Sequence, residues 1–311
     1  MAERATLVGY RAGWAIVRWM PYRIAYRSFD LLADVAWRRH GKGVERMRSN
    51  YGIVRPELSP AELDGLVRAG MRSYLRYWCD SFRLPDCSVD DLIAGVRVVG
   101  SEPVRAELQS GRSAVIFLGH MGNWDVAGAW STTQLAPVTT VAERLKPEEL
   151  FDEFVEFREG LGMRIIALTG GTDVFRELIQ ACRDGALVAL LADRDLTNGG
   201  IEVDFFGDRA RMAIGPAALA LNTGAALYPA TVYYEPNPEA HRWRTVVTFH
   251  DAVAPPTQGT SREKIRTMTQ TCADVLAEAV RERTQDWHMM QRVFTKDLVV
   301  ERATDGAGDI R

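Results

Sequence analysis

The sequence predicts an α/β fold with a mostly parallel central sheet, helices on both faces of that sheet, and amphipathic helices ahead of it. From residue 96 onward, short apolar segments of strand type alternate with longer segments of helical periodicity. This alternation is typical of parallel sheets covered by helices. One apolar segment, residues 114–118, carries no polar side chain, as expected of a strand that is buried on both faces.

Length and composition indicate a soluble globular protein. The chain has 311 residues, enough for one large domain or two small ones, with 47% apolar and 25% charged residues. Its cysteines, Cys79, Cys87, Cys182 and Cys272, are widely spaced and form no C-x-x-C pair or Cys/His cluster. This spacing favours a reduced, cytoplasmic setting and argues against a structural zinc site. We expect no metal and no nucleic-acid partner.

The N-terminal segment is basic, although the whole chain has a net charge of −3. Residues 1–48 contain ten Lys/Arg and four Asp/Glu, a local charge of +6, so the rest of the chain carries −9. Residues 5–40 combine apolar and aromatic side chains with regularly placed arginines, and Pro21 starts a second helix or kinks the first. No apolar run approaches the roughly 20 residues that span a bilayer, and arginines interrupt every candidate signal sequence.

Two interpretations of this segment stay open. Basic residues with interfacial aromatics are typical of helices that lie in the headgroup layer of an anionic bilayer. An amphipathic helix pair that packs on the domain and keeps its arginines in solvent shows the same pattern. We assign residues 1–50 to basic amphipathic helices that associate with a membrane, residues 51–296 to the α/β domain, and residues 297–311 to a flexible tail.

The remaining elements follow in chain order. Ser59, with Pro60 and Glu62 after it, predicts the start of a helix that runs to about Phe82 and ends before Pro85. Strands are expected at Val96–Gly100, Ser113–Leu118, Val138–Ala142, Arg164–Leu168, Ala186–Ala192, Ile201–Phe206, Ala225–Tyr234 and Trp243–Phe249. Helices are expected at 123–135, 147–160, 172–184, 213–222 and about 261–284.

The first candidate catalytic region follows the strand that ends at Leu118. Open α/β sheets place reactive groups in a crevice at the carboxyl ends of their strands, and here the chain presents His120, Asn123 and Asp125. A helix that begins near Asn123 holds Asp125 in its first turn, where the carboxylate can reach back to the imidazole. Such a carboxylate favours the imidazolium and suits a general base. The alternative is a capping pair beside a chance histidine.

Two further clusters contain charged side chains. The Asp-Arg-Asp sequence at 193–195 follows an apolar strand, so it can face the same crevice as His120; a structural ion pair is the alternative. Glu202 lies on one face of a predicted strand, and Arg209 and Arg211 offer cations beside it. These arginines are suited to a phosphate or a lipid headgroup, with a solvated basic turn as the alternative.

Missing motifs narrow the chemistry. The sequence has no G-x-S-x-G elbow, no Walker loop, and no G-x-G-x-x-G after a strand. The other histidines are expected to be surface or packing residues: His40, His241, His250 and His288. A base without a nucleophile of its own indicates direct attack by a hydroxyl group of the substrate.

An ordered set of motifs resembles a known family. His120-x-x-x-x-Asp125 after a strand resembles the first motif of glycerolipid and lipid A acyltransferases, and the layout of about residues 8–295 resembles the lipid A biosynthesis acyltransferase family. The further motifs are Arg144 and Arg158 around a helix, Leu191-Ala-Asp193-Arg194-Asp195, Glu202-Val-Asp-Phe-Phe-Gly207, Gly215-Pro216-Ala217 and Trp287-His-Met-Met-Gln-Arg292-Val-Phe294.

The resemblance implies a reaction and a location. Within the family the sequence is similar to the actinobacterial phosphatidylinositol mannoside acyltransferases. This implies acyl-CoA, palmitoyl-CoA especially, as the donor and a mannose hydroxyl of a phosphatidylinositol mannoside as the acceptor. It also implies a peripheral, monotopic position on the cytoplasmic face of the plasma membrane. No cofactor is expected, because acyl-CoA is a co-substrate.

The resemblance also implies site residues. It suggests that His120 pairs with Glu202, which makes Asp125 a second orienting carboxylate or a structural one. The substrate is expected to bind to arginines, namely Arg158, Arg194, Arg209 and Arg211. The segment 142–145 lacks the Arg-Pro that lipid A enzymes often show, which argues against lipid A itself as the acceptor. The alternatives are another glycolipid such as a lipid A precursor, a donor on acyl carrier protein, a thioesterase, and a lipid-binding protein of the same fold.

Overall fold

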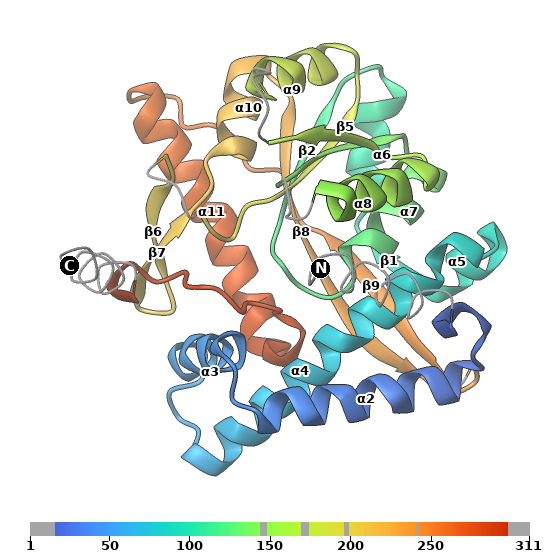
Figure 1. The fold of residues 1–311 in the computed structure, drawn as a ribbon. Coiled ribbons are helices and arrows are strands. Elements are labelled where there is room, and N and C mark those ends of the chain that lie inside the picture. The colour runs from blue at the N-terminus through green and yellow to red at the C-terminus, as the bar shows by residue number, and fades with distance from the viewer. Residues whose placement is uncertain (1–15, 144–147, 169–173, 196–198, 241, 298–311) are drawn as a thin grey trace, which may run out of the picture.

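A seven-stranded sheet forms the centre of the molecule (Figure 1). The computed structural model describes residues 16–143, 148–168, 174–195, 199–240 and 242–297. The strand order is β1-β9-β8-β2-β5-β3-β4, and every neighbouring pair is parallel except β8 and β9. The strands are β1 (Val96–Val99), β2 (Ala114–Leu118), β3 (Val138–Ala142), β4 (Arg164–Ala167), β5 (Leu187–Leu191), β8 (Ala226–Asn237) and β9 (Arg242–Phe249). The predicted mostly parallel sheet is therefore confirmed.

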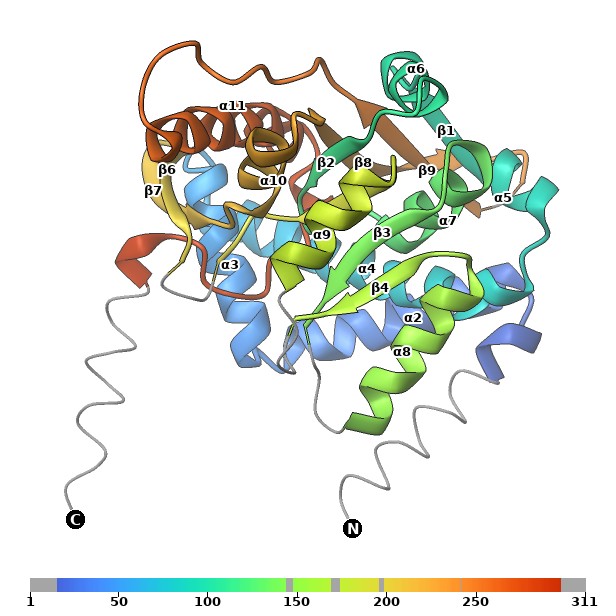
Figure 2. The ribbon, with the colours of Figure 1, turned by 90° about the horizontal axis from the view of Figure 1, so that it is seen from above.

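Helices cover both faces of the sheet, as predicted (Figure 2). Side chains of a strand point alternately to opposite faces, so β2 sends Val115 and Phe117 to one side and Ala114 and Ile116 to the other. The first side packs on α9 (Val174–Arg183), α10 (Gly215–Thr223) and α11 (Ser261–Glu282). The second side packs on α6 (Glu102–Gln109), α7 (Trp124–Gln134) and α8 (Glu148–Gly160). Because β2 is buried on both faces, its wholly apolar sequence is explained.

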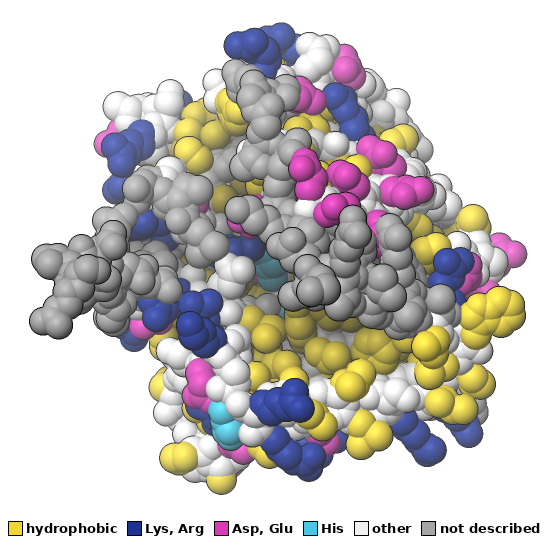
Figure 3. Space-filling model, viewed as in Figure 1, with side chains coloured by type: hydrophobic (Ala, Val, Ile, Leu, Met, Phe, Trp, Pro, Cys, Tyr) yellow, Lys and Arg dark blue, Asp and Glu magenta, His cyan; other side chains and the backbone are white. Residues whose placement is uncertain are grey.

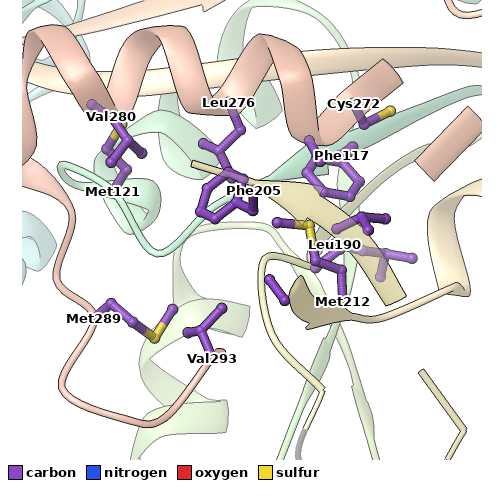
Figure 4. Close-up of a cluster of buried hydrophobic side chains, with 14 of the residues drawn as sticks. Phe117, Met121, Leu190, Phe205, Met212, Cys272, Leu276, Val280, Met289 and Val293 are labelled. Atoms are coloured by element: carbon purple, nitrogen blue, oxygen red, sulfur yellow. The ribbon is translucent and has the colours of Figure 1, made fainter. Parts of the chain in front are cut away.

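The larger core cluster lies on the α11 side of the sheet. Figure 4 shows Met121 beside Val280 of α11, Leu190 of β5 beside Met212, and Met289 beside Val293, all in the cluster that includes Phe117 of β2. Met121 belongs to the loop that follows β2, and Met289 belongs to the segment that follows α11. The same cluster that stabilises the fold therefore also fixes the loop in which the candidate base lies.

Helices α2 (Tyr22–Arg38), α3 (Lys42–Val54) and α4 (Pro60–Arg83) precede the sheet. The capping box predicted at Ser59 is present, with the side chain of Ser59 accepting from the Glu62 N–H while the Glu62 carboxylate accepts from the Ser59 N–H. On α2, the buried carboxylate of Asp34 accepts hydrogen bonds from Arg68 and Arg72 of α4. Helix α2 begins directly after Pro21, as expected, and packs against α4.

Several short elements complete the chain. Strands β6 (Ile201–Phe205) and β7 (Asp208–Met212) form a separate antiparallel pair. Arg209 and Arg211 were considered as part of a basic turn, but they lie on strand β7. The backbone of β7 pairs with β6, and its small and long side chains alternate between the two faces. The connecting helices are η1 (Leu84–Asp86), α5 (Val89–Gly95) and η2 (Thr284–Asp286).

Some predictions concern parts of the chain for which the structure gives less. Residues 1–15, Arg144, His241 and the predicted tail from residue 298 onward lie outside the described residues. The predicted domain boundary at residue 50 falls inside α3, and the division into domains stays a prediction. Among the described helices, none combines the length and the apolar character that crossing a membrane requires.

Candidate active site

The loop between β2 and α7 carries the candidate base. It contains Gly122 at φ +59°, and a Cβ at this position would lie 2.5 Å from the carbonyl oxygen of Val232 on β8. The Gly122 N–H donates to the carbonyl of Asp286 at 2.8 Å, and the His288 N–H donates to the carbonyl of His120 at 2.7 Å. Glycine allows both the backbone conformation and the close approach. The backbone of His120 is thus held at the carboxyl end of a central strand.

His120 pairs with Asp193. Strands β2 and β5 are parallel neighbours that align Leu118 with Leu191, so the residues that follow them meet at one edge of the sheet. Nδ1 of His120 lies 2.5 Å from Oδ1 of Asp193, and the His120 N–H donates to Oδ2 at 2.9 Å. The indole N–H of Trp287 also donates to Oδ2, at 2.9 Å. We expected that the 193–195 cluster can face the same crevice as His120, and Asp193 of this cluster does lie beside His120.

Asp193 is suited to stabilise a protonated imidazole. Its side chain is fully buried, whereas that of His120 is 19% exposed. Burial opposes the charge of Asp193, but the charge of His120 and the hydrogen bonds from His120 and Trp287 hold the pKa of this carboxyl below its usual range. Asp193 occupies Nδ1, which leaves Nε2 of His120 as the nitrogen available to the cavity that His120 lines.

Glu202 is placed elsewhere. It lies exposed on β6, directly opposite Arg211 of β7, in the two-stranded sheet that is separate from the central one. The resemblance suggested that His120 pairs with Glu202, but the carboxylate at Nδ1 is that of Asp193. The alternating pattern of β6 explains the difference, because Ile201 and Val203 take the buried face and turn Glu202 to solvent. A catalytic role for Glu202 stays a prediction that its position does not favour.

Asp125 holds an arginine instead of the imidazole. Helix α7 begins after Asn123, whose side chain accepts from the Val126 N–H, so Asp125 falls in the first turn as expected. However, Asp125 is buried and accepts from Nε of Arg158 at 2.8 Å and from the hydroxyl of Tyr77 at 2.7 Å. The carboxylate thus turns toward α8 and α4 rather than back to His120. Of the two roles implied for Asp125, the structural one fits this position.

A cavity of about 280 Å³ opens beside His120. Its wall contains the charged side chains of Arg158, Arg194 and Glu143. Arg194 donates to the side chain of Gln291, which also lines the cavity, and lies 3.7 Å from a carboxylate oxygen of Glu143. Aromatic side chains form much of the remaining wall, namely Tyr74, Tyr77, Trp78, Trp124, Phe151 and Phe154. The cavity is therefore cationic at some points of an otherwise largely apolar wall.

The other two arginines lie apart from this cavity. Of the described residues, neither Arg209 nor Arg211 belongs to its wall. Arg209 is exposed on β7 and pairs with Asp204 at 3.3 Å. The structure thus brings Arg158 and Arg194 to His120 and does not bring Arg209 or Arg211 there.

A second, narrower cavity of about 80 Å³ lies between the sheet and α7. Its wall is mostly apolar and includes Leu118, Gly128, Met163 and Leu191. Trp124 and Arg158 line both cavities, so the apolar cavity adjoins the one beside His120. This arrangement can hold an apolar chain next to a reactive histidine.

One wall residue was missed at the sequence level. His288, expected at the surface or in packing, is 5% exposed and lines the cavity with His120. The only signal for it was its place in the apolar segment Trp287-His-Met-Met, where a polar side chain among apolar neighbours requires a hydrogen-bond partner. Among the residues that the structure describes, no group of three or more His, Cys, Asp or Glu side chains is arranged to hold a metal ion.

Comparison with known proteins gives consistent matches along nearly the whole chain. The profile of a family described as bacterial lipid A biosynthesis acyltransferase matches residues 2–296. A phosphatidylinositol mannoside acyltransferase of Mycolicibacterium smegmatis is 40% identical over 304 residues, which cover 97% of this chain and 95% of that protein. A phosphatidylinositol mannoside acyltransferase of Mycobacterium tuberculosis is 39% identical over 305 residues, which cover 97% of this chain and 92% of that protein.

Proposed function

The chain belongs to the bacterial lipid A biosynthesis acyltransferase family, and on that premise we propose that it transfers a long-chain acyl group, palmitoyl in particular, from acyl-CoA to a mannose hydroxyl of a phosphatidylinositol mannoside. The observation that carries this proposal is the pairing of His120 with the buried Asp193 in the wall of a cavity that adjoins an apolar one. The names of the relatives support the choice of acceptor.

In the proposed reaction, Nε2 of His120 takes the proton of the attacking hydroxyl while the oxygen forms a bond to the thioester carbonyl carbon. The tetrahedral intermediate then collapses, the C–S bond breaks, and the thiolate of CoA leaves with the proton from Nε2. Asp193 stabilises the imidazolium in between, through the Nδ1 contact of 2.5 Å. General-base assistance of this kind contributes about 10²- to 10⁴-fold to a rate.

The walls of the two cavities are suited to the reacting carbonyl group and to the acyl chain of the donor. The guanidinium groups of Arg158 and Arg194 provide positive charge near the developing oxyanion. The apolar cavity behind Trp124 and Arg158 takes the start of the acyl chain, where each buried methylene contributes about 0.8 kcal/mol to binding. Donor affinity should therefore rise with chain length.

We propose that α2 lies on the cytoplasmic face of an anionic membrane. Ten large apolar side chains are exposed in the described residues, and six of them fall between residues 16 and 35. On α2 the exposed Ile24, Leu31 and Val35 share one stripe with Arg27 and Arg38. Apolar side chains interleaved with arginines are typical of helices in the headgroup layer.

The charge distribution supports this orientation. Figure 3 shows hydrophobic side chains and Lys/Arg together along the lower side of the molecule, over α2, whereas acidic side chains gather over α8. The exposed face of α8 carries Glu148, Glu149, Asp152, Glu156 and Glu159. An anionic surface attracts the first region and repels the second. The cavity lined by residues of α4 and α8 lies between them.

The test is a mass-spectrometric assay with palmitoyl-CoA, with and without a phosphatidylinositol mannoside. Formation of the acylated mannoside only with the acceptor supports the proposal. Free palmitate that forms regardless of acceptor would indicate a thioesterase, and binding without any product would indicate a lipid-binding protein. Palmitoyl acyl carrier protein and a lipid A precursor serve as the competing donor and acceptor, and preference for either would reassign that substrate.

His120→Ala tests the role of the base. We expect it to lower transfer by at least about 10²-fold, while circular dichroism shows an unchanged fold. His40→Asn is the matched control, because His40 is an exposed histidine that pairs with Glu45 after α2. Undiminished turnover by His120→Ala would remove His120 from the mechanism.

A further inference from the structure

A second imidazole belongs to the wall of the cavity beside His120. His288 is 5% exposed, and its backbone N–H donates to the carbonyl of His120 at 2.7 Å. Its ring packs among Tyr74, Tyr77 and Trp124, with ring centroids 5.7, 6.2 and 6.1 Å away. These three aromatic residues line the same cavity. His288 therefore has a fixed place close to the proposed base.

A hydrogen-bonded chain behind the ring determines the tautomer of His288. The Ser73 hydroxyl lies 2.5 Å from Oδ1 of Asp286 and 3.0 Å from Nε2 of His288. Oδ2 of Asp286 accepts from the Tyr234 N–H at 3.1 Å, so both oxygens of this carboxylate act as acceptors. A hydroxyl has one proton, and Ser73 donates it to Asp286. The contact between Ser73 and His288 is therefore made by an Nε2–H that donates to the serine oxygen.

This tautomer leaves a lone pair on Nδ1. Within the described part of the chain, Nδ1 of His288 is buried and has no hydrogen-bond partner. Buried polar atoms in proteins are nearly always satisfied by protein, water or ligand. Ser73 contacts Nε2 and Asp286 lies behind Ser73, and neither residue lines the cavity. The ring of His288 therefore meets the cavity with an edge other than the one that carries Nε2. The unsatisfied acceptor is thus a candidate contact for a substrate.

The chemistry of the contact selects its partner. A lone pair in a buried wall attracts O–H and N–H groups and repels carbonyl and phosphate oxygens. At the reacting end of an acyl thioester the oxygen is a carbonyl, whereas a sugar acceptor carries several hydroxyl donors. Burial and the charges of Arg76 and His120 lower the pKa of His288 to about 3, so the ring stays an acceptor at neutral pH.

We infer that His288 binds the polyhydroxylated acceptor, with Nδ1 accepting a hydrogen bond from a sugar hydroxyl next to the one that attacks. The inference deepens the proposed function and rests on it. A site that accepts a hydrogen bond from a hydroxyl discriminates against an analogue that lacks it, because the buried acceptor is then left unpaired. His288 would in this way help to determine which hydroxyl is presented to His120.

Two substitutions separate the two nitrogens of the ring. His288→Gln places an amide near the position of Nε2 and keeps a group for Ser73, but removes the acceptor at Nδ1. His288→Asn places an amide oxygen near the position of Nδ1. We expect His288→Gln to raise the KM for the mannoside about tenfold or more, while the KM for palmitoyl-CoA stays within about twofold. His288→Asn should restore part of the acceptor KM.

Acceptors that lack single mannose hydroxyls complete the test. Wild-type protein should discriminate strongly against one of these deoxy acceptors, and His288→Gln should lose that discrimination. Nitrogen-15 NMR of His288 should show the proton on Nε2. The inference is overturned by an unchanged acceptor KM in His288→Gln, by equal discrimination in both proteins, or by a proton on Nδ1. Absence of any transfer by wild-type protein would instead overturn the proposed function and the inference together.

Discussion

The carboxylate of Asp193 contacts His120 at two places, at Nδ1 of the imidazole and at the backbone N–H of His120. No other carboxylate among the described residues is hydrogen-bonded to that imidazole. The side chain of Asp193 also accepts from the indole of Trp287, in the segment that pairs with the loop of His120. One carboxylate thus orients the ring and fixes its backbone. Glu202, the other candidate partner, is exposed on β6.

The first prediction compares these two carboxylates. Asp193→Asn should lower kcat by about 10³- to 10⁴-fold, because the amide does not stabilise an imidazolium and favours the wrong tautomer of His120. Glu202→Gln should keep kcat within about twofold. Steady-state kinetics with palmitoyl-CoA and the mannoside measure both variants. A larger loss in Glu202→Gln than in Asp193→Asn would assign the partner to Glu202.

The second prediction concerns the ion pair between Asp125 and Arg158. The side chain of Asp125 is 3% exposed and that of Arg158 is 18% exposed, so Asp125→Asn leaves a largely buried guanidinium without its counter-charge. Removing one partner of a buried pair costs about 3–5 kcal/mol, and we expect a free energy of unfolding lower by about that amount. Urea unfolding measures it.

Asp204→Asn is the matched control for that substitution. Asp204 pairs with Arg209, but the two side chains are 71% and 57% exposed. Exposed pairs contribute about 0–1 kcal/mol, so the free energy of unfolding should change little. Equal effects of Asp125→Asn and Asp204→Asn would contradict the structural role of Asp125.

The order and type of the main elements could be predicted because local sequence determines them. The wholly apolar β2, the capping box at Ser59 and the strand–helix alternation after residue 96 depend on patterns within a few residues. Strand β7 could not be predicted, because its Arg-Ala-Arg sequence resembles a basic turn until its pairing with β6 is known. Pairing across a long separation is not encoded in local periodicity.

The site was predictable only in part for the same reason. His120 follows a glycine break at a strand end, so its position was visible in the sequence. The sequence offered Asp125 and Glu202 as partners of His120, and the structure has Asp193 there because β5 lies beside β2 whereas β6 belongs to another sheet. His288 is brought to the cavity by the segment after α11, which lies far from His120 in sequence.

The third prediction concerns the backbone of the loop of His120. In Gly122→Ala the alanine must adopt φ +59°, which L residues with a side chain rarely do, and its Cβ lies 2.5 Å from the Val232 carbonyl oxygen. Gly111, at φ +76°, has no atom within 4 Å of such a Cβ. Gly111→Ala should therefore cost only about 1 kcal/mol of conformational strain, and Gly122→Ala clearly more. Thermal unfolding of both variants checks this, and similar losses would show that the approach to β8 relaxes easily.

The fourth prediction tests the exposed stripe of α2. Leu31 and Val35 are 67% and 43% exposed. If they enter the headgroup layer, Leu31→Ser with Val35→Ser should weaken binding to anionic liposomes by about 2 kcal/mol, or about 30-fold. Sedimentation with the liposomes measures the binding. Val89→Ser with Val99→Ser is the control, since these residues are 54% and 43% exposed on α5 and β1 and should leave binding unchanged.

The fifth prediction is a pH dependence that originates at Asp80 on α4. Burial raises the pKa of Asp80 to about 6. The hydrogen bond of 2.7 Å that Asp80 accepts from the Tyr26 hydroxyl on α2 lowers this pKa and so opposes the effect of burial. Between about pH 4 and pH 6 the folded protein keeps this carboxyl protonated while the unfolded chain ionises it. The stability contributed by this group is therefore present below about pH 4 and is lost as the pH rises to about 6.

Asp80→Asn removes this titration while keeping an oxygen for Tyr26. The stability of the wild type relative to Asp80→Asn should fall by up to about 1.4 kcal/mol per pH unit between pH 4 and pH 6 and stay constant above. Tyr26→Phe should extend the upper end of this pH range, because the lost hydrogen bond had lowered the pKa of Asp80 in the folded protein. Urea unfolding at several pH values measures all three proteins. A difference that does not vary between pH 4 and pH 7 would show that Asp80 ionises at its ordinary pKa, with the contact between α2 and α4 open to water.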